Sequence, residues 1–206
     1  LPFSAFAATD IYGPVYLDDR IVPDETFRKY LLKQFDKDGN GVMTPAERYA
    51  VTEIDVNDKN ITSLKGIEFF PNLKKLNCGH NRLTSLDVSK NTELTYLDCG
   101  YNRLTELDVS QNTKLTELYF VSNKITSLQA DNCTNLTELY TGSNKYKVEV
   151  YKKTRILDPS ILPGNFDISR VRNLKGATQN ADGTLTVQEG GGKVTYEYRC
   201  VGEIYK

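Results

Sequence analysis

The sequence has one histidine (His80), one methionine and no tryptophan among its 206 residues. A single histidine leaves little material for acid–base catalysis or for a zinc site. There is no run of about 18 apolar residues, so we expect no segment to span a membrane. Neither sign of charge is in excess, because 26 Lys and Arg face 27 Asp and Glu. This balance argues against nucleic acid as the partner.

The chain begins with a short apolar stretch, residues 1–8, that ends in the small residues Ala7 and Ala8. Such a stretch is typical of the end of a secretory signal peptide. We therefore predict a secreted or cell-surface protein, with residues 1–8 as the remnant of the signal. The alternative is a disordered apolar leader or a truncated strand.

The most informative feature of the sequence is an internal repeat. The frame that starts at Leu73 recurs at Leu94, Leu115 and Leu136, at intervals of 21 residues. A leucine column and an asparagine column run through the four copies: Leu76, Leu97, Leu118 and Leu139, and Asn81, Asn102, Asn123 and Asn144. An earlier, incomplete copy around Ile54 has Lys59 in the asparagine column. This spacing is the leucine-rich repeat frame.

In this frame each repeat supplies one short parallel strand, whose alternate side chains enter a core shared with its neighbours. The asparagine amides are expected to bond the backbone of their own turn and of the next one. We predict an α/β solenoid, a short, right-handed leucine-rich repeat array of 21-residue repeats over residues 51–146. A helical cap over residues 9–50 precedes it, and a small β cap over residues 147–206 follows it.

Two of the four cysteines, Cys78 and Cys99, fall in an inward-facing column and are expected to be small core residues. Adjacent strands are close enough for a disulfide, but side chains that point the same way seldom reach its torsion angle. Cys133 and Cys200 have no evident mates. We expect free thiols, although the sequence leaves three pairings open.

Ahead of the repeats, residues 36–47 form a complete EF-hand loop pattern. Asp36, Asp38, Asn40 and Glu47 supply side-chain oxygens, Val42 a backbone carbonyl, and a glycine follows Asn40 at the sharp turn. We predict a structural calcium site, because sensor EF-hands work in pairs and only one loop is visible. A single loop suits millimolar extracellular calcium, which agrees with export. The alternative is an Asp- and Gly-rich turn that binds nothing.

The flanks of this loop predict two helices. Asp24 can cap a first helix, whose apolar residues Phe27, Leu31 and Phe35 recur every four residues. Residues 44–47 form a capping box with proline at the first helical position, which predicts a second, short helix ending before Val51.

After the repeats the pattern changes to a β-rich one. Val148–Lys152 predicts a strand and Asp167–Leu174 a short helix. Thr184–Val187 and Val194–Cys200 alternate apolar and polar residues, which predicts two strands, and Glu189–Gly192 between them predicts a hairpin turn.

No nucleophile with a base, no carboxylate pair in a pocket and no open metal site is visible, so we expect no enzyme activity. The outward-facing strand positions instead suggest a protein-binding face with exposed tyrosines, a residue type enriched at interfaces. These positions are Lys75, Asn77, Tyr96, Asp98, Glu117, Tyr119, Glu138 and Tyr140, with Tyr101 at the edge. The alternative is that the tyrosines only pack against each other across the strands.

The repeats at Leu73–Ser89 and Leu94–Ser110 resemble those of exported bacterial internalin-type leucine-rich repeat proteins. With the loop at residues 36–47, Gly66-Ile67 and the segment Leu162–Asp167, most of the chain is similar to surface or secreted proteins of gut bacteria. The resemblance implies protein–protein binding or adhesion at a cell surface, without catalysis. We expect a monomer that does not span the membrane. The alternative function is a non-binding spacer within a longer surface protein.

Overall fold

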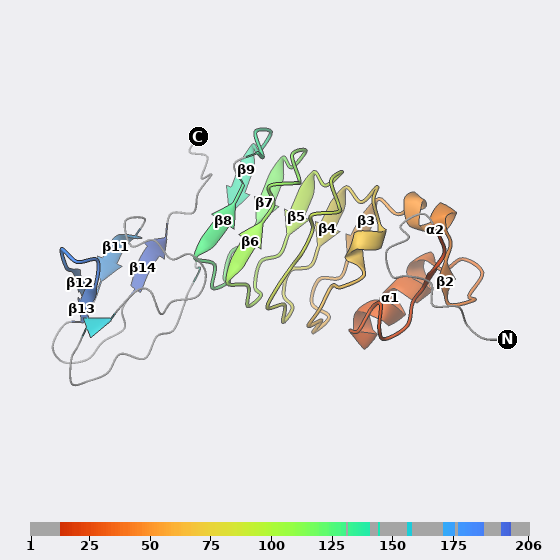
Figure 1. The fold of residues 1–206 in the computed structure, drawn as a ribbon, viewed down its shortest axis with the longest axis horizontal. Coiled ribbons are helices and arrows are strands. Elements are labelled where there is room, and N and C mark those ends of the chain that lie inside the picture. The colour runs from red at the N-terminus through yellow and green to blue at the C-terminus, as the bar shows by residue number, and fades with distance from the viewer. Residues whose placement is uncertain are drawn as a thin grey trace.

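The computed structural model describes residues 13–130, 132–140, 144, 156–157, 171–175, 177–187 and 195–198. Its central part is a β-solenoid of about four turns, preceded by two helices (Figure 1). The predicted signal remnant, the strand at Val148–Lys152, the turn at Glu189–Gly192 and Cys200 lie outside the described residues. In the part of the chain that the model describes, no helix has the length and apolar character needed to cross a membrane.

The N-terminal part consists of a two-stranded sheet and two helices, as the sequence predicts for the helices. Its elements are β1 (Val15–Tyr16), α1 (Glu25–Phe35), β2 (Val42–Met43) and α2 (Pro45–Ala50). Strands β1 and β2 pair antiparallel, with Val15 opposite Met43. Helix α1 buries Phe27 and Leu31, both 0% exposed, against the same core as the repeats.

Both helices begin at the predicted caps. The Asp24 side chain accepts a hydrogen bond from the Phe27 N–H at 3.0 Å. In α2, the Thr44 hydroxyl accepts from the Glu47 N–H at 3.3 Å while Glu47 accepts from the Thr44 N–H at 2.8 Å. Each cap satisfies N–H groups that have no partner inside the helix. The second of these caps also fixes the end of the loop between the helices, where α2 begins.

Two contacts join the helices to the first repeat. The second carboxylate oxygen of Asp24 accepts from the Thr62 N–H at 2.8 Å and from the Thr62 hydroxyl at 2.9 Å. Gly66 has a positive φ of 106°, and a Cβ there would lie 2.6 Å from Cγ2 of Val22. Only glycine fits this close approach without a shift of the neighbouring segment.

Replacing Asp24 with alanine is expected to lower the free energy of unfolding by about 2 kcal/mol, because both the helix cap and the bonds to Thr62 are lost. Burial raises the pKa of Asp24, but the hydrogen bonds from Thr62 and Phe27 outweigh it and lower the pKa below the ordinary 3.8. The charged form is thus favoured in the folded state, so this stabilisation is present above pH 3.8 and is lost as the pH falls through the lowered pKa. Urea unfolding of Asp24→Ala and Asp24→Asn as a function of pH measures both effects. Equal stability of all three proteins at neutral pH would contradict this prediction.

The solenoid carries one five-stranded parallel sheet in the order β3-β4-β5-β7-β9. Its strands are β3 (Glu53–Asp55), β4 (Lys75–Asn77), β5 (Tyr96–Asp98), β7 (Glu117–Tyr119) and β9 (Glu138–Tyr140). The leucine column is in register across the sheet, with Ile54 opposite Leu76 at its start and Leu118 opposite Leu139 at its end. The predicted parallel array is confirmed, and the incomplete first copy around Ile54 supplies its first strand.

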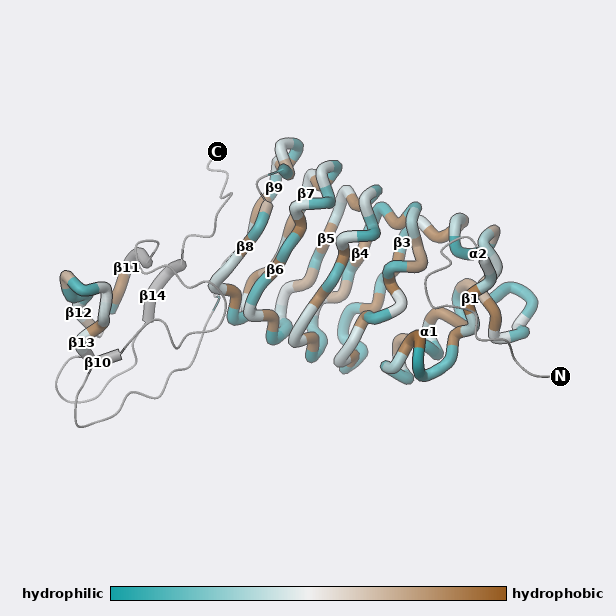
Figure 2. The backbone as a smooth tube through the Cα atoms, viewed as in Figure 1, coloured by the Kyte–Doolittle hydropathy of each residue, from teal (hydrophilic) through white to brown (hydrophobic). Residues whose placement is uncertain are grey.

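Two further elements of the solenoid were not predicted. Strands β6 (Glu106–Asp108) and β8 (Ser127–Gln129) form a separate two-stranded parallel sheet, and η1 (Ile67–Phe69) is a single 3₁₀ turn before β4. Hydrophobic and hydrophilic residues alternate along the turns of the solenoid (Figure 2). The apolar residues form one continuous core, in which Leu76, Leu97 and Leu118 are 0% exposed.

The asparagine column behaves as predicted. The Asn102 amide nitrogen donates to the carbonyls of Cys78 at 3.0 Å and Cys99 at 3.1 Å, and its oxygen accepts from the Leu83 N–H at 2.9 Å. Asn81 and Asn123 repeat this arrangement one turn away on either side. Each buried amide therefore links two turns of the backbone.

A second ladder of buried polar side chains lies in the same core, at positions where the sequence analysis assigned no role. The Asn91 amide donates to the carbonyls of Ile67 and Phe70, and the Asn112 amide donates to those of Val88 and Asn91. In the next turn the Cys133 thiol takes this place, with Sγ 3.2 Å from the Val109 carbonyl and 3.5 Å from that of Asn112. The ladder therefore continues where asparagine is replaced.

The described cysteines Cys78, Cys99 and Cys133 are buried, and Cys78 and Cys99 are free thiols, as predicted. Burial raises the pKa of the Cys78 and Cys99 thiols well above the ordinary value. They are therefore protonated core residues at neutral pH.

The C-terminal strands differ from the prediction in two respects. They are β10 (Ile156–Leu157), β11 (Val171–Lys175), β12 (Ala177–Gln179), β13 (Leu185–Val187) and β14 (Thr195–Tyr198). The predicted helix at Asp167–Leu174 is wrong, because Val171–Lys175 is a strand paired antiparallel with β14. The predicted hairpin between Thr184–Val187 and Val194–Cys200 is also wrong.

The physical reason for the second difference is a tighter turn on the other side of β13. The Asn180 N–H donates to the Thr184 carbonyl at 2.8 Å, and Gly183 adopts a φ of +84°. This Asp-Gly turn joins β12 to β13 as neighbouring antiparallel strands. With β13 paired to β12 and β10, strand β14 pairs with β11 instead.

Candidate functional site

Ten side chains point outward from the five-stranded sheet, because side chains alternate between the two faces of a strand. We call this surface the outward face. All ten are partly or fully exposed: Glu53, Asp55, Lys75, Asn77, Tyr96, Asp98, Glu117, Tyr119, Glu138 and Tyr140. Eight of them were predicted. Glu53 and Asp55 were missed, although the incomplete first copy places them 22 residues before Lys75 and Asn77, in the same two columns.

Three tyrosines form a continuous row on this face. The rings of Tyr96 and Tyr119 lie 5.5 Å apart at 37°, and those of Tyr119 and Tyr140 are stacked at 4.6 Å and 7°. Tyr96 and Tyr119 are partly buried, whereas Tyr140, at the end of the row, is 50% exposed. The predicted packing of the tyrosines against each other is thus present, and it leaves an aromatic surface accessible.

The hydroxyl of the tyrosine in the centre of this row, Tyr119, contacts two glutamates. Glu117 and Glu138 occupy paired positions on β7 and β9. The Tyr119 hydroxyl donates to Glu138 at 2.8 Å and lies 3.3 Å from Glu117. The hydrogen bond to Glu138, followed by burial and the two negative charges, raises the pKa of Tyr119 well above its usual range.

At the edge of the face, Tyr101 stacks on His80, with ring centroids 4.1 Å apart and an interplanar angle of 12°. Both residues have positive φ, 53° for His80 and 52° for Tyr101. Each N–H donates to the carbonyl one turn further on, His80 to Gly100 and Tyr101 to Val121. His80 is exposed at this edge.

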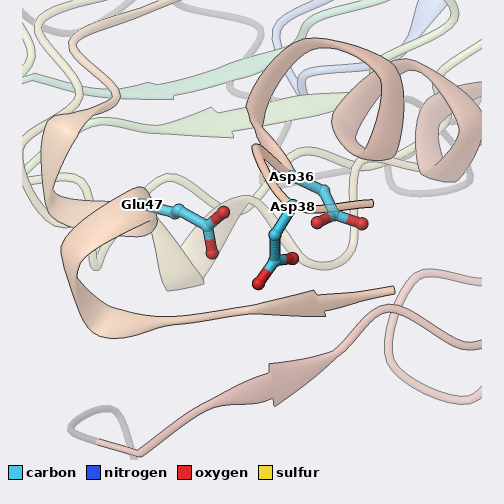
Figure 3. Close-up of side chains that lie close together, drawn as sticks. All are labelled: Asp36, Asp38 and Glu47. Atoms are coloured by element: carbon cyan, nitrogen blue, oxygen red, sulfur yellow. The ribbon is translucent and has the colours of Figure 1, made fainter. Parts of the chain in front are cut away.

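A second candidate site is the loop between α1 and α2. The carboxylates of Asp36, Asp38 and Glu47 point toward one another from the end of α1, the loop and the start of α2 (Figure 3). One oxygen of each lies within 4.8 Å of the others. None of the salt bridges between described residues involves any of the three.

The remaining predicted ligands lie on the same loop. The Asn40 amide donates to Asp38 at 2.7 Å, and the Asn40 oxygen accepts from the N–H of Val42 at 2.7 Å. Asp36 accepts from the N–H groups of Gly39 at 2.9 Å and Gly41 at 2.8 Å. Gly41 has a φ of +79°, the conformation that the sharp turn requires.

Comparison with known proteins identifies the class of the repeats. A family model described as leucine-rich repeats, two copies, matches residues 71–112. These residues contain β4 and β5, and the same register continues through β7 and β9. The family match thus covers two repeats of the solenoid, and the strands on either side share their parallel register.

Among the known proteins that are similar to this chain are two internalins. Internalin J of Listeria monocytogenes (serotype 4b, strain F2365) is 34% identical over 70 residues, which cover 34% of this chain and 8% of that protein. The solved functional domain of internalin J, described as including a cysteine ladder, is 30% identical, with a TM-score of 0.49. That match covers 68% of this chain and 36% of the domain. A crystal structure of the internalin InlF from L. monocytogenes is 26% identical with a TM-score of 0.49, over 64% of this chain and 46% of that one. The chain thus spans less than half of each of these proteins.

Proposed function

We propose that this chain is a non-enzymatic leucine-rich repeat module of a secreted or cell-surface protein, and that it binds a protein partner through the outward face. The observation that carries the proposal is the row of Tyr96, Tyr119 and Tyr140 on a parallel sheet whose backbone is fixed by the solenoid core. Tyrosine gives a large contact area at a low cost in side-chain entropy. The internalin likeness of the repeats supports the surface location.

Exchange of Tyr119 and Tyr140 together for alanine is expected to weaken partner binding about thirtyfold, which corresponds to about 2 kcal/mol for the loss of a binding hot spot. The measurement is the saturable binding of the labelled chain to intact cells, before and after protease treatment of the cell surface. Protease sensitivity identifies the receptor as a protein.

The matched control is Ser127→Ala with Gln129→Ala, which truncates two side chains of β8 on the separate two-stranded sheet. Circular dichroism melting of both double variants checks that the fold is kept. If the tyrosine variant binds with unchanged affinity, the outward face is not the binding surface.

The alternative function, a non-binding spacer in a longer surface protein, is favoured by the small width of the face. Five strands spaced by about 4.8 Å give a width of only about 20 Å. A spacer shows no saturable binding under any condition in this experiment, so the same measurement separates the two functions.

We also propose that the loop between α1 and α2 binds a structural calcium ion. Its donors are hard oxygen atoms, from the carboxylates of Asp36, Asp38 and Glu47, the amide of Asn40 and the carbonyl of Val42, and this chemistry suits calcium. Three carboxylates within 4.8 Å repel each other, and a divalent cation relieves that repulsion. The ion would tie α1 to α2 and so hold the helical cap together.

A further inference from the structure

The outward face differs in charge from the rest of the molecule. Its ten side chains include five acids and one lysine, a formal charge of −4, whereas the whole chain carries −1. The rest of the chain therefore carries a formal charge of +3, since −1 minus −4 is +3. The acids are Glu53, Asp55, Asp98, Glu117 and Glu138.

The central part of this face carries two carboxylates, Glu117 and Glu138, that form no salt bridge with any described residue. Glu117 and Glu138 are directly paired on neighbouring strands, where like charges destabilise a sheet. The Tyr119 hydroxyl is a neutral donor that lies between them. Lys75 stands two strands away, with Tyr96 between it and Glu117.

Negative charge at this place extends beyond the two glutamates. Burial, followed by the negative charges of Asp98, Glu117 and Asp55, raises the pKa of Tyr96. The tyrosine rings add a second attraction for cations, because the face of an aromatic ring carries partial negative charge. Tyr140, half exposed at the end of the row, offers such a ring face to a partner.

The dimensions of the face limit what can occupy it. A width of about 20 Å accommodates about six residues of extended chain, since a strand rises about 3.4 Å per residue. A standard interface between two folded proteins buries about 800 Å² on each partner, more than this face offers. A single segment fits it better than a globular surface.

We propose that the outward face binds an extended segment of protein that carries lysine or arginine side chains, one of which lies between Glu117 and Glu138 beside the tyrosine row. This inference rests on the proposed function and names the chemistry of the partner. Charge complementarity carries it, because the acids and the aromatic rings occur together on the same strands. The binding is weak and depends on salt.

The probe for this inference is a fluorescent six-residue peptide of alternating glycine and arginine, titrated with the whole chain and followed by fluorescence anisotropy. Its matched control contains citrulline, which has the shape of arginine without its charge. We expect the arginine peptide to bind, the citrulline peptide to bind at least tenfold more weakly, and salt at about 500 mM to remove most of the affinity.

Two charge-matched variants of the protein locate the binding. Glu117→Gln with Glu138→Gln keeps an acceptor for the Tyr119 hydroxyl and is expected to reduce the affinity about tenfold. Glu106→Gln with Asp108→Asn removes the same charge from β6, on the separate sheet, and is expected to leave the affinity unchanged. This comparison separates a local contact from general attraction to an acidic protein.

The inference is overturned if the citrulline peptide binds equally well, or if both variants lose affinity equally. It is also overturned if a neutral chitin hexasaccharide binds the face at a salt-independent affinity, which would assign the face to a glycan. The proposed function is tested separately. Protease-sensitive cell binding that requires Tyr119 and Tyr140, without binding of the arginine peptide, would keep a protein-binding face and reject only its basic partner.

Discussion

Replacement of Asn102 with alanine is expected to lower the free energy of unfolding by about 3–5 kcal/mol. The side chain is 8% exposed and satisfies backbone groups of two turns at once. Its loss leaves the Leu83 N–H without its acceptor. The carbonyls of Cys78, Cys99 and Gly100 each lose one donor and keep one, from Asn81, Asn123 and His80 respectively. One unsatisfied buried N–H costs about 1–3 kcal/mol and each further lost hydrogen bond about 0.5–1.5 kcal/mol, so the total exceeds the effect of an ordinary surface substitution.

The measurement is the free energy of unfolding from urea titrations of the wild-type chain and the variant. The matched control is Asn132→Ala, since Asn132 is exposed and donates one bond, to the Ser110 carbonyl at 3.2 Å. The control is expected to change the stability by less than about 0.5 kcal/mol. Equal losses in the two variants would mean that the asparagine column does not hold the turns together.

The parts of the fold that the sequence predicts well are those set by local periodicity. The 21-residue interval places Leu76, Leu97 and Leu118 in one column, and a parallel sheet with this register is the way to bury that column continuously. The helices are predicted equally well, because Asp24 and the box at residues 44–47 mark their first turns by hydrogen bonds within a few residues. In the first case the determining contacts recur at a fixed interval, and in the second they join residues that are close in the sequence.

The parts that the sequence predicts poorly depend on competition between distant segments. Strand β13 could pair with β14 or with β12, and the short turn closed by Gly183 favours β12. The sequence contains a second hairpin signal, Asp182-Gly183, which was not among the predicted turns. Similarly, the separate sheet of β6 and β8 arises from stacking of whole turns, not from a pattern within either segment.

The second ladder shows how the core tolerates cysteine in place of asparagine at position 133. The side-chain oxygens of Asn91 and Asn112 are buried without a hydrogen-bond partner, although their nitrogens are fully used. At Cys133 the thiol contacts the equivalent carbonyls and leaves no oxygen unsatisfied. A thiol is a weaker donor, so a loss in bond strength is offset by the absence of a buried, unpaired acceptor.

For the candidate sites, the sequence identifies the residue types, and the structure supplies their distances. The EF-hand pattern gave Asp36, Asp38 and Glu47 by position alone, and their oxygens lie within 4.8 Å of one another. The shared contact of Tyr119 with Glu117 and Glu138 could not be predicted, because it depends on side-chain directions on two neighbouring strands, β7 and β9.

Calcium at about 2 mM is expected to stabilise the wild-type chain by about 2.7 kcal/mol relative to a chelator, for a site with an affinity of about 20 µM. The gain arises because the ion binds the folded loop, where the carboxylates are already gathered, and not the unfolded chain. Thermal melting with calcium and with chelator measures it.

The variant that tests this site is Asp36→Asn, expected to abolish the calcium-dependent shift. Asparagine keeps an oxygen acceptor toward Gly39 or Gly41, so the variant changes the charge of the loop with less disturbance of its turn than alanine would cause. The control is Asp19→Asn, because Asp19 is exposed and lies outside the loop, and its variant should retain the full shift. Magnesium should stabilise less, since it demands six ligands in a smaller octahedron. If Asp36→Asn and the wild-type chain melt alike with calcium, the loop is an ordinary turn, and the cap is held without an ion, by its packing and by hydrogen bonds such as those of Asp24 to Thr62.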